Sequence, residues 1–403
     1  MQKTMICSFC GRSQPEVGKF IASPNGSAYI CDECIDICFG IMKNDKKPVF
    51  QQKILSPMEI KKHLDDYIVG QEKAKTVLSV AVYNHYKKIE YNQSAKNTDK
   101  FMLEKSNILL VGPTGSGKTL LAKTLAKILQ VPFASCDATT ITETGYVGDD
   151  VESVLTKLLS SAGGDIKKAQ RGIVYIDEID KIAKKSENRN LPKDPAGEGV
   201  QQALLKIIEG TMSTVPVETS KKTPYQETVT MDTSNILFIC GGAFVGLDKI
   251  LQERSKNHIV GFEKKTDNID LTTEILPQDL NKFGLIPEFV GRLPIVTQLD
   301  KLTENDLCEI LTKPKNSIIK QYAEMLKMDD VGFYVTDDAI KAISKKASKL
   351  QDGARGLRTI LENSMLDAMF KLPGTDIKKV TLNADGENLC CTFNNHQATK
   401  QIQ

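Results

Sequence analysis

The sequence predicts an α/β fold in which a parallel-sheet domain follows a cysteine-rich module and precedes a helical small subdomain. Three short apolar runs bounded by turn residues, SNILLVG, GIVYIDE and TSNILFICGG, are typical of buried parallel strands. Helical patterns alternate with these runs, and that alternation indicates an α/β sheet. From about residue 300 the strand patterns thin out, so we expect a second subdomain made mainly of helices.

Changes in composition mark the segment boundaries. Helices of the second subdomain open on a threonine followed by acidic residues, in TENDL and TDDAI, as helix starts do. Polar stretches within the sheet domain are expected to be functional or disordered loops, and they cover 184–200, 212–232 and 249–279. The predicted segments are a cysteine-rich module at 1–42, a linker at 43–56, a large sheet subdomain at 57–299, a small helical subdomain at 300–383 and a disordered tail at 384–403.

Length and charge limit the classes of function. A chain of 403 residues suggests two to three domains, and the net charge of +2 gives no general attraction to nucleic acid. No apolar run approaches the ~18 residues of a membrane span. The beginning, MQKTMICSFCGR, lacks the apolar core of a secretory signal. We therefore expect a cytoplasmic protein without a membrane or nucleic-acid partner.

Five of the ten cysteines lie between residues 7 and 38. Cys7 and Cys10 form one C-x₂-C pair, and Cys31 and Cys34 form a second one 20 residues later. Paired knuckles at this spacing indicate a tetrahedral zinc site, and four thiolates would close it, so the metal is expected to be structural. Cys38 lies one helical turn after Cys34 and is an alternative ligand, and five free thiols are the other alternative.

GPTGSGKT, residues 112–119, matches the complete phosphate-binding pattern and follows an apolar strand. Backbone N–H groups and a helix N-terminus would hold the phosphates, Lys118 would reach the β- and γ-phosphates, and Thr119 would ligate Mg²⁺. A chance glycine-rich turn is the alternative. The predicted nucleotide ligands here are Gly112, Pro113, Thr114, Gly115, Ser116, Gly117, Lys118, Thr119 and Leu120.

IVYIDEID supplies a carboxylate pair at the end of a second strand. Asp177 would hold Mg²⁺, and Glu178 would polarise the attacking water. The alternative is a strand end with two solvated acids. Because parallel strands present their carboxyl ends at one sheet edge, both motifs can meet there, which predicts an ATP hydrolase.

The ordered motifs CSFC…CDEC, DDYIVGQEKAK, GPTGSGKT, GYVGDDVE, IDEIDKIA, GEGVQQALLKIIEG, FGLIPEFVGRLP and GARGLR resemble the ClpX family of AAA+ unfoldases over residues 7–372. The resemblance implies an AAA+ P-loop parallel-sheet domain and a homohexamer that uses ATP, Mg²⁺ and Zn²⁺. It also implies threading of tagged or misfolded proteins through a pore into the ClpP peptidase. The module at 1–42 would dimerise and bind adaptor proteins.

The resemblance assigns roles that isolated residues do not reveal. Arg292 matches the arginine that reaches the neighbouring subunit's nucleotide, and Arg355 matches a sensor arginine of the small subdomain. Ile68 and Val69 match residues that pack on adenine. The strand NILFIC departs from many AAA+ proteins, because it runs into Gly241-Gly242 without a polar sensor residue.

Three loops match substrate and partner sites of the family. Tyr146 and Val147 lie in the pore-loop motif GYVG, and residues 192–202 match a lower pore loop. Lys221 and Lys222 keep two cations of the basic pore-entrance loop, but Thr223 replaces its histidine. The last match is the peptidase-docking tripeptide, which here is Val260, Gly261 and Phe262.

Two other classes of function remain open from the residues. A nucleic-acid motor also combines zinc ribbons with P-loops, but the near-neutral charge weighs against it. A zinc-anchored scaffold without ATPase activity is opposed by the presence of Lys118, Asp177, Glu178 and Arg292. The four histidines form no recognisable peptidase motif.

Overall fold

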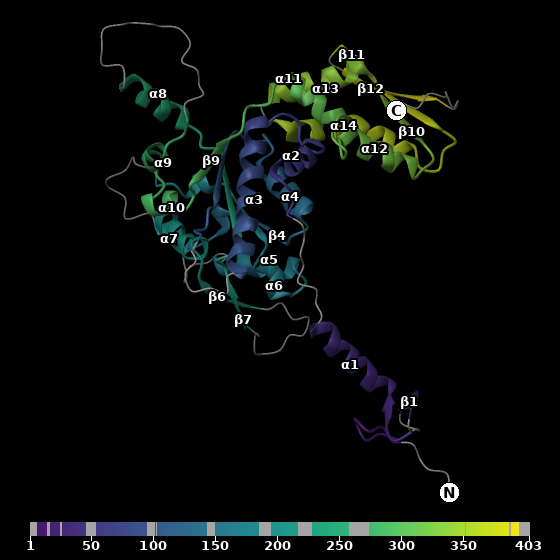
Figure 1. The fold of residues 1–403 in the computed structure, drawn as a ribbon. Coiled ribbons are helices and arrows are strands. Elements are labelled where there is room, and N and C mark those ends of the chain that lie inside the picture. Colours follow the sequence, from purple (N-terminus) through teal and green to yellow (C-terminus); the bar gives the residue numbers. More distant parts are fainter. Residues whose placement is uncertain are drawn as a thin grey trace. The chain divides into compact units, whose positions relative to one another are not determined.

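The computed structural model describes residues 6–13, 17–24, 26–45, 54–94, 101, 103–142, 150–184, 195–216, 228–257, 274–350, 352–386 and 388–394. The chain forms two compact units, Met1–Ile54 and Leu55–Gln403 (Figure 1). Within the described residues, no helix combines the length and the apolar character needed to cross a membrane.

The first unit is a two-stranded hairpin followed by one helix. β1 (Phe20–Ala22) pairs antiparallel with β2 (Tyr29–Cys31), and α1 (Asp32–Asp45) follows directly. Its buried apolar cluster consists of Cys7, Val17 and Cys31. So small a core does not stabilise a fold by itself, and such units need a staple. Because α1 continues to Asp45, the predicted linker at 43–56 is wrong at its start.

A five-stranded parallel sheet forms the centre of the second unit, in the order β4-β5-β8-β3-β9. The sequence predicts three of these strands, and both β3 and β8 are buried along their whole length. Runs of branched apolar residues form such strands because both faces are covered. The strands are β3 (Ile108–Val111), β4 (Phe133–Asp137), β5 (Ile173–Asp177), β8 (Leu237–Gly242) and β9 (Ile295–Gln298).

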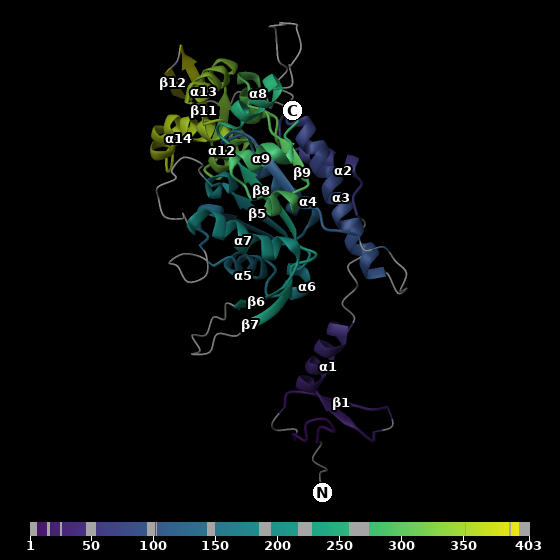
Figure 2. The same ribbon diagram turned by 90° about the vertical axis from the view of Figure 1, so that its left-hand side faces the viewer.

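Helices pack on this sheet, and α3 runs alongside it in both views (Figures 1 and 2). Ser56 caps α2 in a capping box with Glu59. The helices of the large subdomain are α2 (Pro57–Asp65), α3 (Glu72–Ser94), α4 (Lys118–Leu129), α5 (Glu152–Ser161), α6 (Ile166–Ala169), α7 (Pro195–Glu209), α8 (Leu247–Asn257), α9 (Pro277–Phe283) and α10 (Pro287–Gly291), with short 3₁₀ turns η2 (Ala138–Thr140) and η3 (Ile179–Ile182).

The polar stretches of the large subdomain contain regular structure that the sequence analysis does not predict. β6 (Met212–Pro216) pairs antiparallel with β7 (Thr228–Asp232), so 212–232 begins and ends in a hairpin. Val215 and Met231 are fully buried, which explains why these polar segments still form strands. The stretch 249–279 begins within α8 and ends within α9.

The small subdomain combines four helices with a sheet of three strands. The helices are α11 (Glu304–Thr312), α12 (Ile318–Lys327), α13 (Asp337–Leu350) and α14 (Ala354–Lys371). The strand order is β10 (Gly332–Val335), β11 (Lys379–Asp385) and β12 (Asn388–Asn394). Thr303 accepts a hydrogen bond from the Asp306 backbone N–H and caps α11, as its sequence predicts.

The disordered tail predicted from residue 384 is wrong as far as Asn394. β12 pairs with β11 over its full length, from Asp385↔Asn388 to Lys379↔Asn394. Leu389 and Cys391, two residues apart on one face of this strand, pack against the core of the small subdomain. This burial outweighs the polar composition. Residues 395–403 lie outside the described part of the chain.

We predict that His85 makes stability depend on pH. Burial within α3, together with the charge of Lys105, lowers the pKa of His85 to about 3. The unfolded chain binds this proton near its ordinary pKa of about 6.5, so stability is complete above that pH and decreases below it. Between pH 7 and pH 5 this residue should cost about 2 kcal/mol of unfolding free energy.

His85→Gln removes the titrating group, so its unfolding free energy should fall less steeply over this pH range. Urea titrations followed by circular dichroism at pH 7, 6 and 5 measure the slope. Parallel slopes for the two proteins would contradict the assignment, whatever the variant's stability at pH 7.

Candidate functional site

The phosphate-binding loop connects the buried strand β3 to helix α4. Gly115 and Gly117 have φ values of +75° and +101°, a region that L side chains rarely adopt, so the motif needs glycine there. Leu121 and Leu125 are fully buried and fix α4 against the sheet. Ser116 Oγ is buried without a hydrogen-bond partner among the described residues, so the loop retains an unsatisfied polar group.

Lys118 is buried at the first turn of α4. Its Nζ donates to the carbonyl oxygens of Gly112 at 2.7 Å and Pro113 at 3.0 Å, which places the ammonium inside the loop. Desolvation lowers the pKa of Lys118, while the nearby carboxylates of Asp177 and Asp180 oppose this shift. The loop therefore contains a cation held close to an acidic strand end.

The structure brings the two predicted magnesium ligands together. Thr119 Oγ1 donates to Asp177 Oδ2 at 2.9 Å, while Tyr175 and the Glu178 backbone donate to Asp177 Oδ1 at 3.1 and 3.0 Å. Hydroxyl and carboxylate oxygens are the hard donors that Mg²⁺ prefers, so these residues fit the ion. Glu178 is exposed and has a left-handed φ of 56°, a strained conformation of the kind found at functional sites.

Tyr175 and Asp180 lie against the glycine pair at the end of β8, where a polar sensor residue is absent. A Cβ on Gly241 would lie 2.2 Å from the Tyr175 hydroxyl, and one on Gly242 would lie 2.7 Å from Asp180 Oδ1. Asp180 also accepts a hydrogen bond from the Ala243 backbone at 3.1 Å. Polar groups from the β5 segment occupy the space of a β8 side chain. In the sequence, this arrangement could have been inferred only from the glycine pair that follows the apolar run NILFIC.

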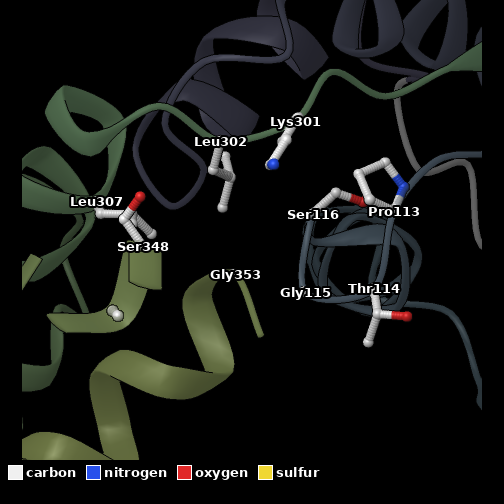
Figure 3. Close-up of a pocket in the computed structure, with 10 residues that line it drawn as sticks. Pro113, Thr114, Gly115, Ser116, Lys301, Leu302, Leu307, Ser348 and Gly353 are labelled. Carbon is white, nitrogen blue, oxygen red and sulfur yellow. The ribbon is translucent and has the colours of Figure 1, made fainter. Parts of the chain in front are cut away.

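An open pocket lies beside the phosphate loop (Figure 3). Figure 3 shows Lys301 and Leu302, which follow β9, between the phosphate loop and the small subdomain. The pocket is lined by Pro113, Thr114, Gly115, Ser116, Lys301, Leu302, Leu307, Ala347, Ser348 and Gly353. Neither Ile68 nor Val69 lines it, and Ile68 is buried with its carbonyl oxygen accepting from Lys75 Nζ at 3.4 Å.

The small subdomain meets the phosphate loop through backbone atoms. The Ala354 N–H donates to the Gly115 carbonyl at 3.2 Å. A Cβ on Gly115 would lie 2.2 Å from the Asp352 carbonyl oxygen, so this approach also requires glycine. Arg355, the next residue in the first turn of α14, is exposed, and its charge contributes to the lowered pKa of Lys118. The predicted sensor arginine therefore lies within electrostatic reach of the loop lysine.

Arg292 lies at the opposite edge of the sheet. Its carbonyl oxygen accepts from the side chain of Asn107, the residue before β3, at 3.0 Å, whereas Lys118 follows the carboxyl end of that strand. Strands rise about 3.3 Å per residue, so β3 alone separates these edges by roughly 13 Å. The Arg292 guanidinium is half-exposed and pairs with Glu209 at 2.9 Å. Within one chain, the structure does not bring Arg292 to the phosphate loop.

A four-cysteine cluster forms the other candidate centre. The Sγ atoms of Cys7, Cys10, Cys31 and Cys34 all lie within 4.8 Å of one another. The Cys7–Cys34 and Cys10–Cys31 pairs are 3.9 and 3.7 Å apart, and tetrahedral zinc with Zn–S bonds of about 2.3 Å sets this spacing near 3.8 Å. The donors therefore fit Zn²⁺, and Cys38 is not a member of the group.

The thiols of this cluster differ in how readily they ionise. Desolvation opposes ionisation of Cys7, but backbone hydrogen bonds at Cys10, Phe9 and Cys31 outweigh it and lower its pKa to about 6. Burial and the neighbouring thiols raise the pKa of Cys34. A cation supplies the compensating charge that a set of clustered thiolates requires.

The predicted loop sites lie outside the described residues. These are Tyr146 and Val147, residues 192–194 of the lower pore loop, Lys221 to Thr223, and the tripeptide Val260, Gly261 and Phe262.

Comparison with known proteins agrees with both centres. Residues 5–44 match the ClpX C4-type zinc finger, 103–296 the AAA domain (Cdc48 subfamily) and 302–379 the C-terminal, D2-small domain, of ClpB protein. The ATP-dependent Clp protease ATP-binding subunit ClpX of Treponema denticola is 53% identical over 388 residues, which cover 94% of this chain and 92% of that protein. The chain, with its AAA domain and its four-cysteine zinc module, therefore belongs to the ClpX family.

Proposed function

We propose that this ATP hydrolase unfolds tagged or misfolded proteins as a homohexamer and delivers them through its pore to the ClpP peptidase. One observation carries the proposal: Arg292 and Lys118 lie at opposite edges of one sheet. An arginine on that edge can complete a nucleotide site only on a neighbouring chain. Such a head-to-tail interface is heterologous, and the proposed homohexamer is the case in which the rotation between neighbours closes into a ring.

The proposed chemistry divides among five sets of residues. Lys118 and the loop N–H groups hold the phosphates, while Thr119 and Asp177 hold Mg²⁺, which neutralises charge on the phosphate oxygens when bound. Glu178 orients the attacking water from its exposed position at the end of β5. Arg292 of the adjacent subunit stabilises the transition-state charge, a contribution of about 10³–10⁵ in rate. Arg355 reports the nucleotide state to the small subdomain.

The proposed substrate path uses Tyr146 and Val147 as the pore grip. An aromatic ring packs on any side chain without requiring a particular sequence, which suits a motor acting on diverse chains. The peptidase would dock on the tripeptide Val260, Gly261 and Phe262. Arg254 on α8 connects the two ends of the insertion that carries this tripeptide, because it donates to the Glu274 carbonyl oxygen at 2.9 Å and to the Asp279 carboxylate on α9. We place the protein in the cytoplasm, with adaptors binding the zinc module.

Mixing two inactive variants tests the shared site. Glu178→Gln should lose about 10²–10⁴-fold of ATPase activity, and Arg292→Ala about 10³–10⁵-fold. In a mixed ring, an Arg292→Ala subunit keeps its own water-orienting Glu178 and receives Arg292 from a Glu178→Gln neighbour. A random equal mixture should therefore recover about a quarter of the wild-type sites.

The measurement is steady-state ATP hydrolysis after co-assembly. Arg358→Ala is the matched control, because Arg358 is also exposed and paired, with Glu362 in its own helix, and should leave the rate unchanged. A mixture no more active than its components would contradict a site completed by the neighbouring chain.

Tyr146→Ala should abolish unfolding of a tagged folded client while ATP hydrolysis is largely retained. The ring, not the hydroxyl, provides the packing surface, so Tyr146→Phe should unfold the client at a rate close to wild type. Loss of client fluorescence measures unfolding. Normal unfolding by Tyr146→Ala would end the gripping proposal.

Removal of zinc should unfold only the first unit. Structural zinc contributes about 10–16 kcal/mol in comparable small modules, far more than the core of this unit can replace. Chelation, or Cys34→Ser, should therefore remove the structure of the module while ATP hydrolysis persists. Metal content and ATPase rate are the readouts, and Cys38→Ser is the matched control that should keep its zinc. Equal zinc loss from both variants would contradict the ligand set.

A further inference from the structure

Gln71 is a buried side chain that joins two segments far apart in the sequence. Its Nε2 donates to the Asp300 carbonyl and its Oε1 accepts from the Asp300 N–H, both at 2.8 Å. The residue is 6% exposed, and its φ is +59°. The left-handed backbone of a non-glycine residue is costly, and such strain is concentrated at functional sites. Both polar atoms of the buried amide are satisfied by Asp300, so loss of these bonds would leave buried polar groups unpaired.

Asp300 begins the chain that crosses from the sheet to the small subdomain. The N–H of the preceding Leu299 donates to the Val111 carbonyl oxygen at 2.7 Å. Leu299 also packs closely on Gly112, because a Cβ added to this glycine would lie only 2.8 Å from the Leu299 Cβ. The following residues, Lys301 and Leu302, line the pocket beside the phosphate loop (Figure 3). Displacement of Asp300 would therefore change the contact with the phosphate loop and the wall of the pocket together.

The segment that carries Gln71 is also anchored at both of its ends. Lys75 is 2% exposed, and its ammonium pairs with Asp65 and Glu72, which fixes α2 against the start of α3. Asp66 bonds to Lys315 of the small subdomain through its carbonyl at 2.9 Å and its carboxylate at 2.7 Å. Between these anchors lie Ile68 and Val69.

We propose that Gln71 is a positioning residue that transmits nucleotide binding to the small subdomain through Asp300. This inference rests on the proposed function and on the expectation from the family resemblance that Ile68 and Val69 pack on adenine. Nucleotide that displaces residues 68–70 moves the amide of Gln71, and the paired hydrogen bonds carry Asp300 with it. Gln71 touches neither phosphate nor water in this scheme and acts only through Asp300.

The chemistry of the contact requires an amide. The Asp300 peptide presents one donor and one acceptor, and a glutamine side chain complements both. Gln71→Met keeps a similar length and removes both hydrogen bonds. Gln71→Glu keeps an acceptor for the Asp300 N–H but faces the Asp300 carbonyl with a second acceptor.

The test measures the movement of the subdomains in the full-length protein. Fluorophores on unnatural amino acids replace Lys167 of α6 and Lys341 of α13, both exposed, and energy transfer between them is followed as a non-hydrolysable ATP analogue is added. Both Gln71 variants should raise the analogue concentration for half-maximal change by roughly fivefold or more, and raise the KM for ATP with it. The kcat of ATP hydrolysis should change less than the KM.

Gln278→Glu supplies the matched control, since Gln278 is exposed on α9 and the chemical change is the same. A Gln71 that served only to stabilise the fold would lower the melting temperature and leave the analogue response at its wild-type midpoint, which would overturn the inference. If the Met variant does not fold, the Glu variant gives the same comparison. Absence of ATP hydrolysis by the wild-type protein would instead refute the proposed function.

Discussion

Close backbone approach at glycines is the constraint on which the arrangement of the ATPase unit depends. Gly112 lies against Leu299, and Gly115 lies against the Asp352 carbonyl, at distances that leave no space for a Cβ. These contacts join the phosphate loop directly to the exit of β9 and to the small subdomain. At the end of β8, Gly241 and Gly242 likewise leave space for the side chains of Tyr175 and Asp180. At each of these glycines a Cβ would overlap a neighbouring atom, so the close packing of these segments requires glycine.

The parallel sheet distributes the chemistry between its two edges. Lys118, Thr119 and Asp177 meet at the carboxyl ends of β3 and β5, because all strands point the same way. Arg292 is held at the amino end of β3 through Asn107. One chain therefore places the phosphate loop and Arg292 at different ends of the same strands. The ring proposed above rests on this division.

The two units obtain their stability in different ways. The second unit buries continuous apolar clusters, which include the wholly buried strands β3 and β8. The first unit buries three residues in its cluster, and two of them are cysteines of the metal site. Metal binding therefore replaces most of the hydrophobic contribution in this unit. Chemical removal of the metal and mutation of the ATPase core act on separable parts of the molecule.

The sequence alone determined the features that arise from local pattern: the zinc knuckles, the phosphate loop, the three apolar strands and the cap of α11. Each of these features depends on the spacing of a few residues in the sequence and on the backbone conformation of those same residues. It did not predict β12, which pairs with β11 and packs the half-buried Leu389 and Cys391 against the core of the small subdomain. Nor did it reveal Gln71, whose partner Asp300 is 229 residues away. Tertiary structure decided these contacts, because a hydrogen bond between remote segments leaves no periodic trace in either of them.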